Sequence, residues 1–351
     1  MSASHPRPLQ GDYVRLMKSP IIATVPLQMQ WPTLDPFLFC AHHNDEYPAG
    51  DADMAPSVGL ESRPLGSDFS GKNGYSMYHG RTVPGFPQHP HRGFETVTIA
   101  RKGLIDHADS MGATARFGGG DVQWMTAGSG IVHSEMFPLV NDAKGNPTEL
   151  FQVWLNLPRD HKMVPAYFTM FWDEQIPRLR EQGVELAMYV GALGEQMPPA
   201  PPPNSWASQA ESDLAIWTLT LQPGVSWTLP IGKGGVHRVL YFFEGEDAQI
   251  AGMDLSAGHG VQLDPTQAVA LRAGSAPAQF LLLQGRPIGE PVVQHGPFVM
   301  NTKAEIQQTM QEYRQTRFGG WPWPKDDPTH AREQGRFAIH ADGRREEPPK
   351  G

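Results

Sequence analysis

The chain has 351 residues, 39% of them apolar, and a formal net charge of −9. This length allows one large hydrophobic core or two ordinary ones, and we expect two domains. The acidic balance argues against the basic surface that nucleic-acid-binding proteins usually carry, so we predict no direct contact with nucleic acid.

The cysteine count and the lengths of the apolar runs indicate the cellular compartment of the protein. A single cysteine, Cys40, allows no internal disulfide, which fits a reducing compartment. The N-terminus lacks a signal-peptide pattern, and no run of about 18 apolar residues could span a membrane. We expect a cytoplasmic protein with no membrane partner, and we expect it to be a monomer.

Glycine and proline are abundant, with 37 and 34 residues, which favours many short strands joined by turns. We therefore predict an all-β fold. The first convincing apolar run covers residues 34–40, and the Gly-, Pro- and Asp-rich stretch that follows is expected to be irregular. It contains His42 and His43, which as neighbours on a strand would face opposite sides. We interpret them as part of a loop at a barrel mouth, where binding residues often lie, rather than as metal ligands.

The β pattern is steady from Tyr75 onward. Val97 and Ile99 alternate, Gly103 marks a turn into 104–107, and residues 118–121 carry the glycines and the aspartate of a tight turn. Such a turn would help to bring the strand of His133 beside the strand of His89. A further strand at 149–157 ends at Pro158, and we place a domain boundary near residue 165.

A second β block follows, with expected strands at 184–190, 225–229 and 239–243. A proline-rich loop at 198–203 is interpreted as stiff and polyproline-like, with a docking site for a proline-binding module as the alternative. His237-Arg238 resembles His91-Arg92, but Gly235 stands where the partner of His89 would be. No His-x-Glu pair follows, so we predict no metal site in this half.

Near the C-terminus the apolar period changes to about 3.6. Thr302 and Glu305 form a capping-box pattern, and Ile306, Met310 and Tyr313 fall on one face of the helix that follows. The polar tail at 325–351 is expected to be either disordered or strapped over the surface. The expected domains are thus 1–165 with an irregular arm at 1–33, 166–300, and 301–351 as helix and tail.

Two spaced pairs carry the most specific chemistry. His89 and His91 share one face of an extended strand, and so do His133 and Glu135. If the two strands are neighbours in one barrel, three imidazoles and one carboxylate converge, a donor set that suits iron, manganese, nickel, copper or zinc. The alternative is four polar residues satisfied by ordinary hydrogen bonds, but two such pairs favour a metal.

Several other polar and aromatic residues lie near these pairs in the sequence. Glu95 and Gln123 stand in apolar strand contexts and could orient a ligand histidine, or could face solvent. We predict that Arg92 forms a structural salt bridge near the barrel rim. Trp124 and Met125 are expected to be core or pocket wall.

Four motifs together resemble the pirin family. They are HPHRGFETVT at 89–98, GDVQWMTAG at 120–128, IVHSE at 131–135 and QVWLNLP at 152–158, with GRPIGEPV at 285–292 and GPFVMN at 296–301 in support. The resemblance covers about residues 34–324. The long loop at 40–74 and the proline-rich loop depart from the family pattern and could reshape the pocket mouth.

The resemblance implies two cupin domains, jelly-roll β-barrels placed face to face, with a few short helices including one near the C-terminus. It also implies one metal, held in the N-terminal barrel by the residues that match His89, His91, His133 and Glu135. Iron(II) is the metal that the family suggests, and the C-terminal barrel is expected to be structural.

Two functions follow from the resemblance. The first is a quercetin 2,3-dioxygenase, which opens the central ring of a flavonol with O₂ and releases carbon monoxide; Glu135 would then be catalytic, accepting a proton from the substrate. The alternative is a non-enzymatic, redox-sensing regulatory protein that binds a transcription or metabolic partner.

Overall fold

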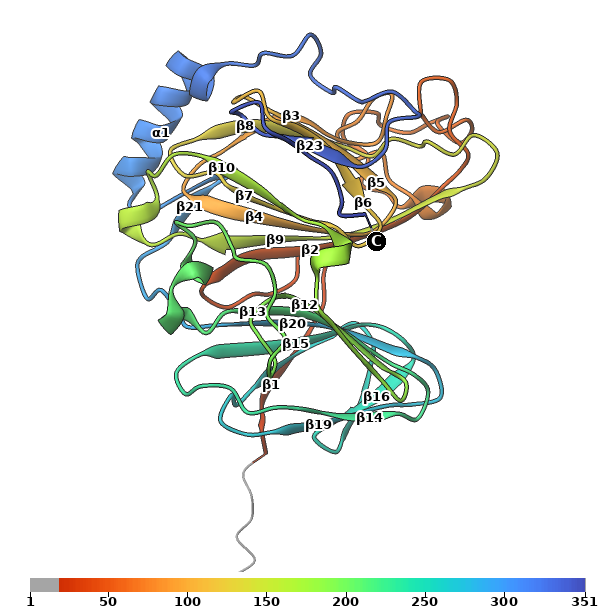
Figure 1. Cartoon of the computed structure of the whole chain (residues 1–351), viewed down its shortest axis with the longest axis vertical. Coiled ribbons are helices and arrows are strands. Elements are labelled where there is room, and N and C mark those ends of the chain that lie inside the picture. The colour runs from red at the N-terminus through yellow and green to blue at the C-terminus, as the bar shows by residue number, and fades with distance from the viewer. Residues whose placement is uncertain (1–18, 351) are drawn as a thin grey trace, which may run out of the picture.

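The computed structural model describes residues 19–350, which form two β domains stacked on one another (Figure 1). Each domain consists of two facing sheets. The N-terminal domain has a five-stranded and a six-stranded sheet, and the C-terminal domain has a seven-stranded and a four-stranded sheet. The expected fold of two cupin domains, mostly β with one C-terminal α-helix, is confirmed.

The N-terminal domain carries the expected ligand pairs. In spatial order its five-stranded sheet consists of β10 (Tyr167–Phe171), β7 (Val122–Thr126), β4 (Phe94–Lys102), β9 (Asn146–Asn156) and β2 (Phe37–Tyr47). The six-stranded sheet that faces it consists of β24 (Arg345–Glu346), β23 (Phe337–Ile339), β6 (Thr114–Gly118), β5 (Leu104–Asp109), β8 (Ile131–Met136) and β3 (Gly85–His91).

The C-terminal domain repeats the two-sheet plan. Its seven-stranded sheet consists of β1 (Ile21–Pro26), β18 (His259–Leu263), β15 (His237–Glu244), β20 (Ala278–Gly285), β13 (Ala215–Leu221), β12 (Val184–Val190) and β11 (Arg178–Glu181). The four-stranded sheet consists of β14 (Ser226–Leu229), β19 (Val269–Ala273), β16 (Asp247–Ile250) and β17 (Met253–Ser256).

The remaining elements are short. A two-stranded sheet of β21 (Val293–His295) and β22 (Phe298–Met300) precedes helix α1 (Lys303–Thr316). Single 3₁₀ turns occur at η1 (Lys72–Gly74), η2 (Arg159–His161), η3 (Asp173–Gln175), η4 (Trp206–Ser208), η5 (Ala210–Ser212) and η6 (Arg317–Gly319). Within residues 19–350, no helix is both long and apolar enough to cross a membrane.

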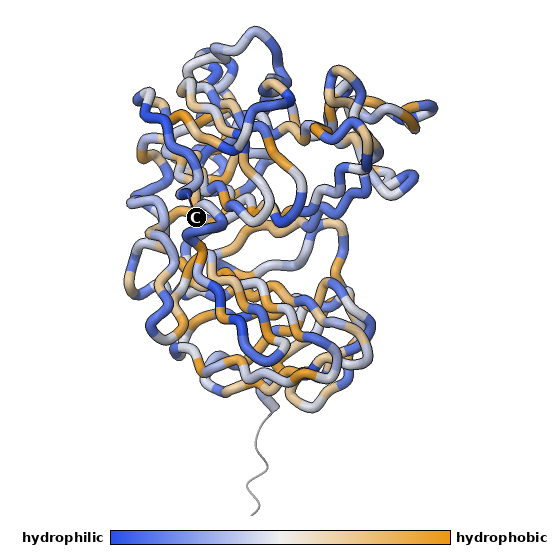
Figure 2. The backbone as a smooth tube through the Cα atoms, turned by 45° about the vertical axis from the view of Figure 1, so that its right-hand side comes forward, coloured by the Kyte–Doolittle hydropathy of each residue, from blue (hydrophilic) through white to orange (hydrophobic). Residues whose placement is uncertain are grey.

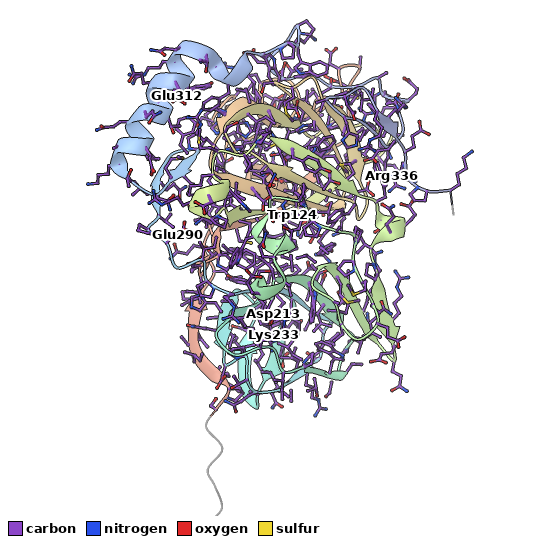
Figure 3. All side chains as sticks on the ribbon, turned by 60° about the vertical axis from the view of Figure 1, so that its left-hand side comes forward. Trp124, Asp213, Lys233, Glu290, Glu312 and Arg336 are labelled. Atoms are coloured by element: carbon purple, nitrogen blue, oxygen red, sulfur yellow. The ribbon has the colours of Figure 1, made fainter. Side chains whose placement is uncertain are left out.

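The two domains meet through their larger apolar faces. One side of β4 presents Val97 and Ile99 to a cluster that includes Ile216 and Tyr241 of the C-terminal domain. Trp124 lies in this cluster, between the domains (Figure 3). The other side of β4 faces the interior of its own domain, so the strand is buried on both faces from Phe94 to Ala100, although it carries the polar residues Glu95 and Thr98.

A second apolar cluster of twenty buried residues fills the interior of the C-terminal domain, where Leu240, Phe242 and Phe280 pack together. Apolar segments of the chain accordingly run through the strands of both domains (Figure 2). His237, the residue that resembles His91, has Nδ1 2.7 Å from the carbonyl oxygen of Asp35. The described part of this domain therefore has a packed apolar interior and contains no group of metal-ligating side chains.

The expected turn at 118–121 joins β6 to β7. Gly119 and Gly120 have φ of 63° and 111°, and a Cβ at Gly120 would lie 1.8 Å from a carboxylate oxygen of Asp173. Asp121 accepts a hydrogen bond from the amide of Gly118 at 2.9 Å. Glycine is thus required here by the backbone angle and by the close approach of Asp173.

Helix α1 forms as its sequence predicts. Thr302 accepts a hydrogen bond from the amide of Glu305, whose side chain reaches back to the amide of Thr302. Ile306 is buried against Phe298 and Met300, with Met310 packed beside them. The predicted capping box and apolar face are confirmed, and the helix covers one end of the N-terminal domain (Figure 1).

The structure corrects three sequence-based expectations about where elements begin and end. The stretch after Cys40 is not irregular at first, because β2 continues to Tyr47 with its side chains alternating between two packed faces. The expected boundary at residue 165 precedes β10, which pairs with β7 and so still belongs to the N-terminal domain. Within the expected arm at 1–33, residues 21–26 form β1, which pairs with β18; residues 1–18 lie outside the described part.

The polar tail is strapped over the N-terminal domain, one of the two alternatives for it. Strand β23 pairs with β6 at the sheet edge. Before it, the buried side chain of Arg116 donates hydrogen bonds to the carbonyls of His330, Ala331 and Gln334. The same guanidinium binds both carboxylate oxygens of Asp106, at 2.6 and 2.7 Å. One buried ion pair therefore links the tail to the sheet that carries the histidines.

We predict that Arg116→Leu destabilises the protein by about 3 to 5 kcal/mol, because it leaves the Asp106 carboxylate buried without a partner. It should also release the tail to trypsin cleavage near Lys325. Urea unfolding and timed proteolysis measure the two effects. Arg180→Leu is the matched control, since Arg180 is 67% exposed in its pair with Glu185 and its loss should cost less than about 1 kcal/mol. Equal losses in the two variants would contradict the role of Arg116.

Candidate metal centre and cavity

Three histidines come together on the inner face of the six-stranded sheet. His89 and His91 project from the same side of β3, and His133 projects from β8, with His89 and His133 directly opposite one another in the ladder. The possible ligand atoms of the three imidazoles all lie within 4.8 Å of one another. They form the one such group of metal-ligating side chains in residues 19–350.

The hydrogen bonding of these imidazoles fits a metal better than a self-contained polar cluster. Neither ring nitrogen of the buried His133 has a partner among the described residues, and the same holds for Nδ1 of His91. Nδ1 of His89 lies 2.9 Å from the carbonyl oxygen of Pro87, which leaves Nε2 for a ligand. Unpaired buried polar atoms are costly, so the donor set indicates a bound cation.

Burial also sets the charge of the histidines. Desolvation lowers the pKa of His89 to about 4 and the pKa values of His91 and His133 well below the usual range. The imidazoles are therefore neutral near pH 7, which is the form that binds a metal.

Glu135 lies next to the triad, as its position two residues after His133 predicts. Its Oε2 is 3.9 Å from Nε2 of His133, so the carboxylate stands at the edge of the group. The hydroxyl of Thr98 lies 2.9 Å from Oε1, and the amide of Gln152 donates to Oε2 at 3.3 Å. Burial raises the pKa of Glu135, which makes this carboxylate a stronger base than one in water.

A glycine permits the close approach of β3 and β8 at this point. Gly85 has a φ of 129°, and a Cβ there would lie 2.4 Å from the carbonyl oxygen of Glu135. A larger residue at 85 would push the two strands apart beside the ligand pairs.

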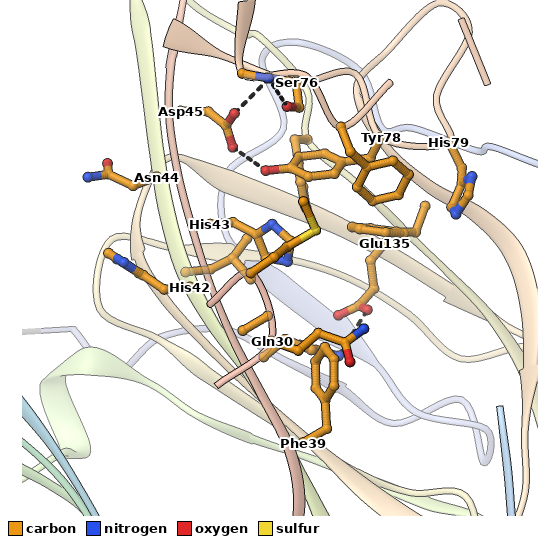
Figure 4. A pocket seen from close by; sticks show the side chains of 18 of the residues that line it. Gln30, Phe39, His42, His43, Asn44, Asp45, Ser76, Tyr78, His79 and Glu135 are labelled. Carbon is orange, nitrogen blue, oxygen red and sulfur yellow. Dashed lines mark hydrogen bonds between the residues drawn. The ribbon is translucent and has the colours of Figure 1, made fainter. Parts of the chain in front are cut away.

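His89, His91 and Glu135 line a cavity of about 710 Å³ between the two sheets of the N-terminal domain. Figure 4 shows Glu135 and His43 both directed into this space from different walls. The lining is largely aromatic, with the side chains of Phe39, Phe69, Tyr78, Phe86, Phe137 and Trp154. The volume and the mixture of apolar walls with a few polar groups are those of a small-molecule site.

The long segment after β2, which departs from the family pattern, forms part of the cavity mouth. Phe69 and Ser70 line the cavity, and the segment is held by the buried pair of Arg63 and Asp68, whose atoms are 2.6 Å apart. Arg63 also lies over the ring of Tyr75, with 3.9 Å between its guanidinium carbon and the ring centroid. The mouth is therefore an ordered wall of the cavity.

The two residues considered for orienting a histidine have different positions. Glu95 lies on the outer face of β4, fully buried and hydrogen-bonded by the hydroxyls of Thr126 and Ser205, so it neither orients a ligand histidine nor faces solvent. Gln123 lies opposite Thr98 in the β4–β7 ladder and shares its inward face. Its carboxamide is buried with no hydrogen-bond partner among the described residues.

The structural interpretations of three neighbouring residues are confirmed. Arg92 pairs with Glu312 of helix α1 at 2.5 Å, which is a salt bridge at the rim. Trp124 and Met125 are fully buried and belong to separate core clusters.

Sequence reasoning placed His43 at the barrel mouth but in a loop, and it missed Asp45, Gln152 and Trp154 as cavity residues. His43 and Asp45 line the cavity because β2 continues past Cys40 with Phe39, Ala41, His43 and Asp45 on one face. Gln152 and Trp154 project inward from β9 in the same alternating manner. The signal was present as a period of two, but the polar residues of β2 obscured it.

Comparison with known proteins shows the family of this chain. The Pirin family model matches residues 21–155, and the model of the Pirin C-terminal cupin domain matches residues 216–319. A pirin-like protein of Solanum lycopersicum is 39% identical over 236 residues, which are 66% of this chain and 75% of the relative. Human Pirin is 33% identical over 256 residues, 70% of this chain and 81% of its own length. The chain belongs to the pirin family.

Within the family, some similar proteins carry the name of an enzyme. A Pseudomonas aeruginosa protein provisionally named quercetin 2,3-dioxygenase is 37% identical over 244 residues, 67% of this chain and 79% of the relative. The crystal structure of a quercetin 2,3-dioxygenase from Acinetobacter baumannii matches with a TM-score of 0.68 and 26% identity, covering 86% of this chain and 99% of that one. The chain is thus similar to proteins that are named quercetin 2,3-dioxygenase.

We predict that the purified protein binds one equivalent of divalent metal and that His133→Ala abolishes this binding. The reason is that His133 contributes one of the three imidazoles of the triad. Elemental analysis and zinc titration measure the stoichiometry. His237→Ala is the control, because His237 lies in the C-terminal domain outside the triad and should leave metal binding unchanged. Two tightly bound equivalents, or retention of metal in His133→Ala, would contradict the prediction.

A second prediction concerns Glu95 at the domain interface. Burial raises its pKa to about 7. A raised folded-state pKa means that the folded state holds a proton which the unfolded state releases, so the contribution of Glu95 to stability is lost as pH rises from about 4.5 to 7. Glu95→Gln should therefore be more stable than the wild type at pH 8, by on the order of 2 kcal/mol, and should lose that advantage near pH 4.5. Urea unfolding at both pH values tests this, and a constant difference between them would refute it.

Proposed function

We propose that this member of the pirin family is a metal-dependent dioxygenase of the quercetin 2,3-dioxygenase type, which acts on a flavonol. The observation that carries the proposal is a cluster of three imidazoles beside one carboxylate, with His89, His91 and Glu135 on the wall of a cavity that is lined in part by aromatic side chains. The similarity to proteins named quercetin 2,3-dioxygenase supports the substrate class.

We propose that His89, His91, His133 and Glu135 together hold the metal. Three neutral imidazoles and one carboxylate suit iron, manganese, nickel, copper or zinc, and we take Fe(II) as the metal in the cell because of the family resemblance. The metal, when bound, supplies Lewis-acid polarisation of the substrate's oxygen atoms and redox chemistry with O₂. Side chains of this protein orient the substrate, exclude water and accept its proton.

The cavity walls provide orientation for a planar substrate. Aromatic side chains such as Phe86 and Trp154 offer flat apolar surfaces against which a flavonol's fused rings can pack. Phe86 stands opposite Glu135 in the β3–β8 ladder, so an aromatic wall adjoins the carboxylate. A substrate packed there would present its hydroxyl and ketone oxygens to the triad, with water excluded from the contact.

Glu135 is the proposed catalytic residue. As the flavonol binds, the 3-hydroxyl proton passes to a carboxylate oxygen of Glu135, which leaves the substrate as an anion. Thr98 and Gln152 hold the carboxylate in position by the hydrogen bonds described above.

We predict that Glu135→Gln retains metal and binds quercetin but turns it over at least tenfold more slowly, a change of about 1.4 kcal/mol in the barrier. The amide keeps the size and one oxygen donor while removing the basicity, and loss of a general base typically costs about 10² to 10⁴ in rate. Oxygen consumption with metal-loaded protein measures the effect. Thr98→Val, which retains the carboxylate and loses one hydrogen bond to it, should lose less activity.

Two outcomes would contradict the proposal at different levels. Full activity of metal-loaded Glu135→Gln would remove the role of Glu135 and leave the enzyme intact. No oxygen consumption by the wild type with any flavonol, whether loaded with iron, manganese, nickel or copper, would contradict the enzyme itself and would favour the regulatory, partner-binding function.

A further inference from the structure

His43 is directed into the same cavity from β2 (Figure 4). This strand belongs to the five-stranded sheet, whereas the expected metal ligands lie on the six-stranded sheet. Its ring meets the ring of Tyr78 edge-on, with 4.7 Å between centroids, and lies 5.8 Å from that of Phe86. Neither of its ring nitrogens has a hydrogen-bond partner among the residues that the structure describes. The imidazole thus has its ring packed and its polar atoms available.

The other titratable side chains around this part of the cavity are already engaged. His42 faces the domain interface, where it is 3.1 Å from a carboxylate oxygen of Glu149 and stacks on Phe151. His79 has Nδ1 3.0 Å from the carbonyl oxygen of Gly66. Asp45 accepts hydrogen bonds from Ser76 and Tyr78. Among these titratable side chains, His43 is therefore the one with both ring nitrogens free of hydrogen bonds to the described residues, beside uncharged polar lining residues such as Gln30 and Asn44.

The orientation of His43 is fixed by a rigid neighbour. The Tyr78 hydroxyl donates to Asp45 at 2.7 Å, and the Tyr78 backbone is held by two hydrogen bonds with Asp68, at 2.7 and 2.8 Å. Tyr78 has a φ of 55°, a conformation that a bulky residue adopts only where its surroundings impose it. The aromatic surface against which His43 packs is therefore preorganised.

We propose that His43 sets the substrate specificity of this cavity by hydrogen bonding to a ring hydroxyl of the flavonol that lies away from the metal-facing oxygens. The inference rests on the proposed function, because it assumes an aromatic substrate held at the triad. It identifies the preferred ligands as flavonols with additional ring hydroxyls, rather than the bare hydroxyl-ketone core.

The chemical state of His43 suits this contact. Burial, with a smaller contribution from His42, lowers the pKa of His43 to about 4, so its ring is neutral near pH 7. A neutral imidazole offers one N–H donor and one acceptor nitrogen, and a phenolic hydroxyl can satisfy either. A substrate lacking that hydroxyl would leave the imidazole nitrogens unpaired when the cavity closes around it, which is the basis of discrimination.

The test compares binding of quercetin and 3-hydroxyflavone, which share the hydroxyl-ketone unit and differ in their other ring hydroxyls. Zinc-loaded protein is used without oxygen, so that binding is measured without turnover, by calorimetry. We expect the wild type to prefer quercetin, and His43→Phe to reduce that preference by about three- to tenfold, the value of one hydrogen bond, with affinity for 3-hydroxyflavone nearly unchanged. His43→Gln, which restores a donor and an acceptor, should recover part of the preference.

The control variant is His259→Phe in the C-terminal domain, which should keep the wild-type preference because His259 does not line the cavity. Equal affinity of the wild type for the two flavonols would overturn the inference without any variant. An unchanged preference in His43→Phe would also overturn the inference. In that case the proposed function would still stand if the wild type turned over flavonols. Failure of the wild type to bind either flavonol would overturn the proposed function and this inference together.

Discussion

The burial of three neutral imidazoles on two paired strands is the constraint on which the rest of the N-terminal domain depends. The β3–β8 ladder places His89 opposite His133, and a slip of one residue would turn one pair to the far side of the sheet. The packed environment keeps the histidines uncharged and leaves ring nitrogens without protein partners. Such an arrangement is costly unless a cation completes it, so register, burial and metal binding are linked.

The second domain contributes to the site through its position. Its seven-stranded sheet covers the outer face of β4, β7 and β9, and this contact allows those strands to be apolar outside and partly polar inside. Thr98 and Gln152 can then point inward to hold Glu135, while their neighbours Val97 and Val153 pack between the domains. The interior of the second domain is filled by apolar side chains, so it offers few polar groups that could bind a ligand. This is consistent with a supporting role.

Segments outside the regular sheets determine the surroundings of the cavity. The mouth segment that carries Phe69 and Tyr78 is braced by the buried pair of Arg63 and Asp68. On the other side, the tail after α1 lies beyond the matched C-terminal family region, which ends at residue 319. It nevertheless reaches the ligand-bearing strand, because the amide of Gln88 donates to the carbonyl of Asp326 at 2.7 Å. These contacts connect cavity shape and sheet stability to parts of the chain far from the histidines in sequence.

The sequence by itself determined the features that depend on local spacing. The two ligand pairs, the turn at 118–121, the capping box of α1 and the family motifs are all short patterns, and each can be read without knowing its neighbours in space. Tertiary structure decided the rest. His43 and Asp45 line the cavity because β2 pairs with β9 along its whole length, so a polar stretch that resembles a loop remains a strand. Glu95 and Gln123 look alike in sequence, yet a strand's alternation turns Glu95 toward the second domain and Gln123 toward the interior of its own domain, and only the packing of the sheets reveals which face is which.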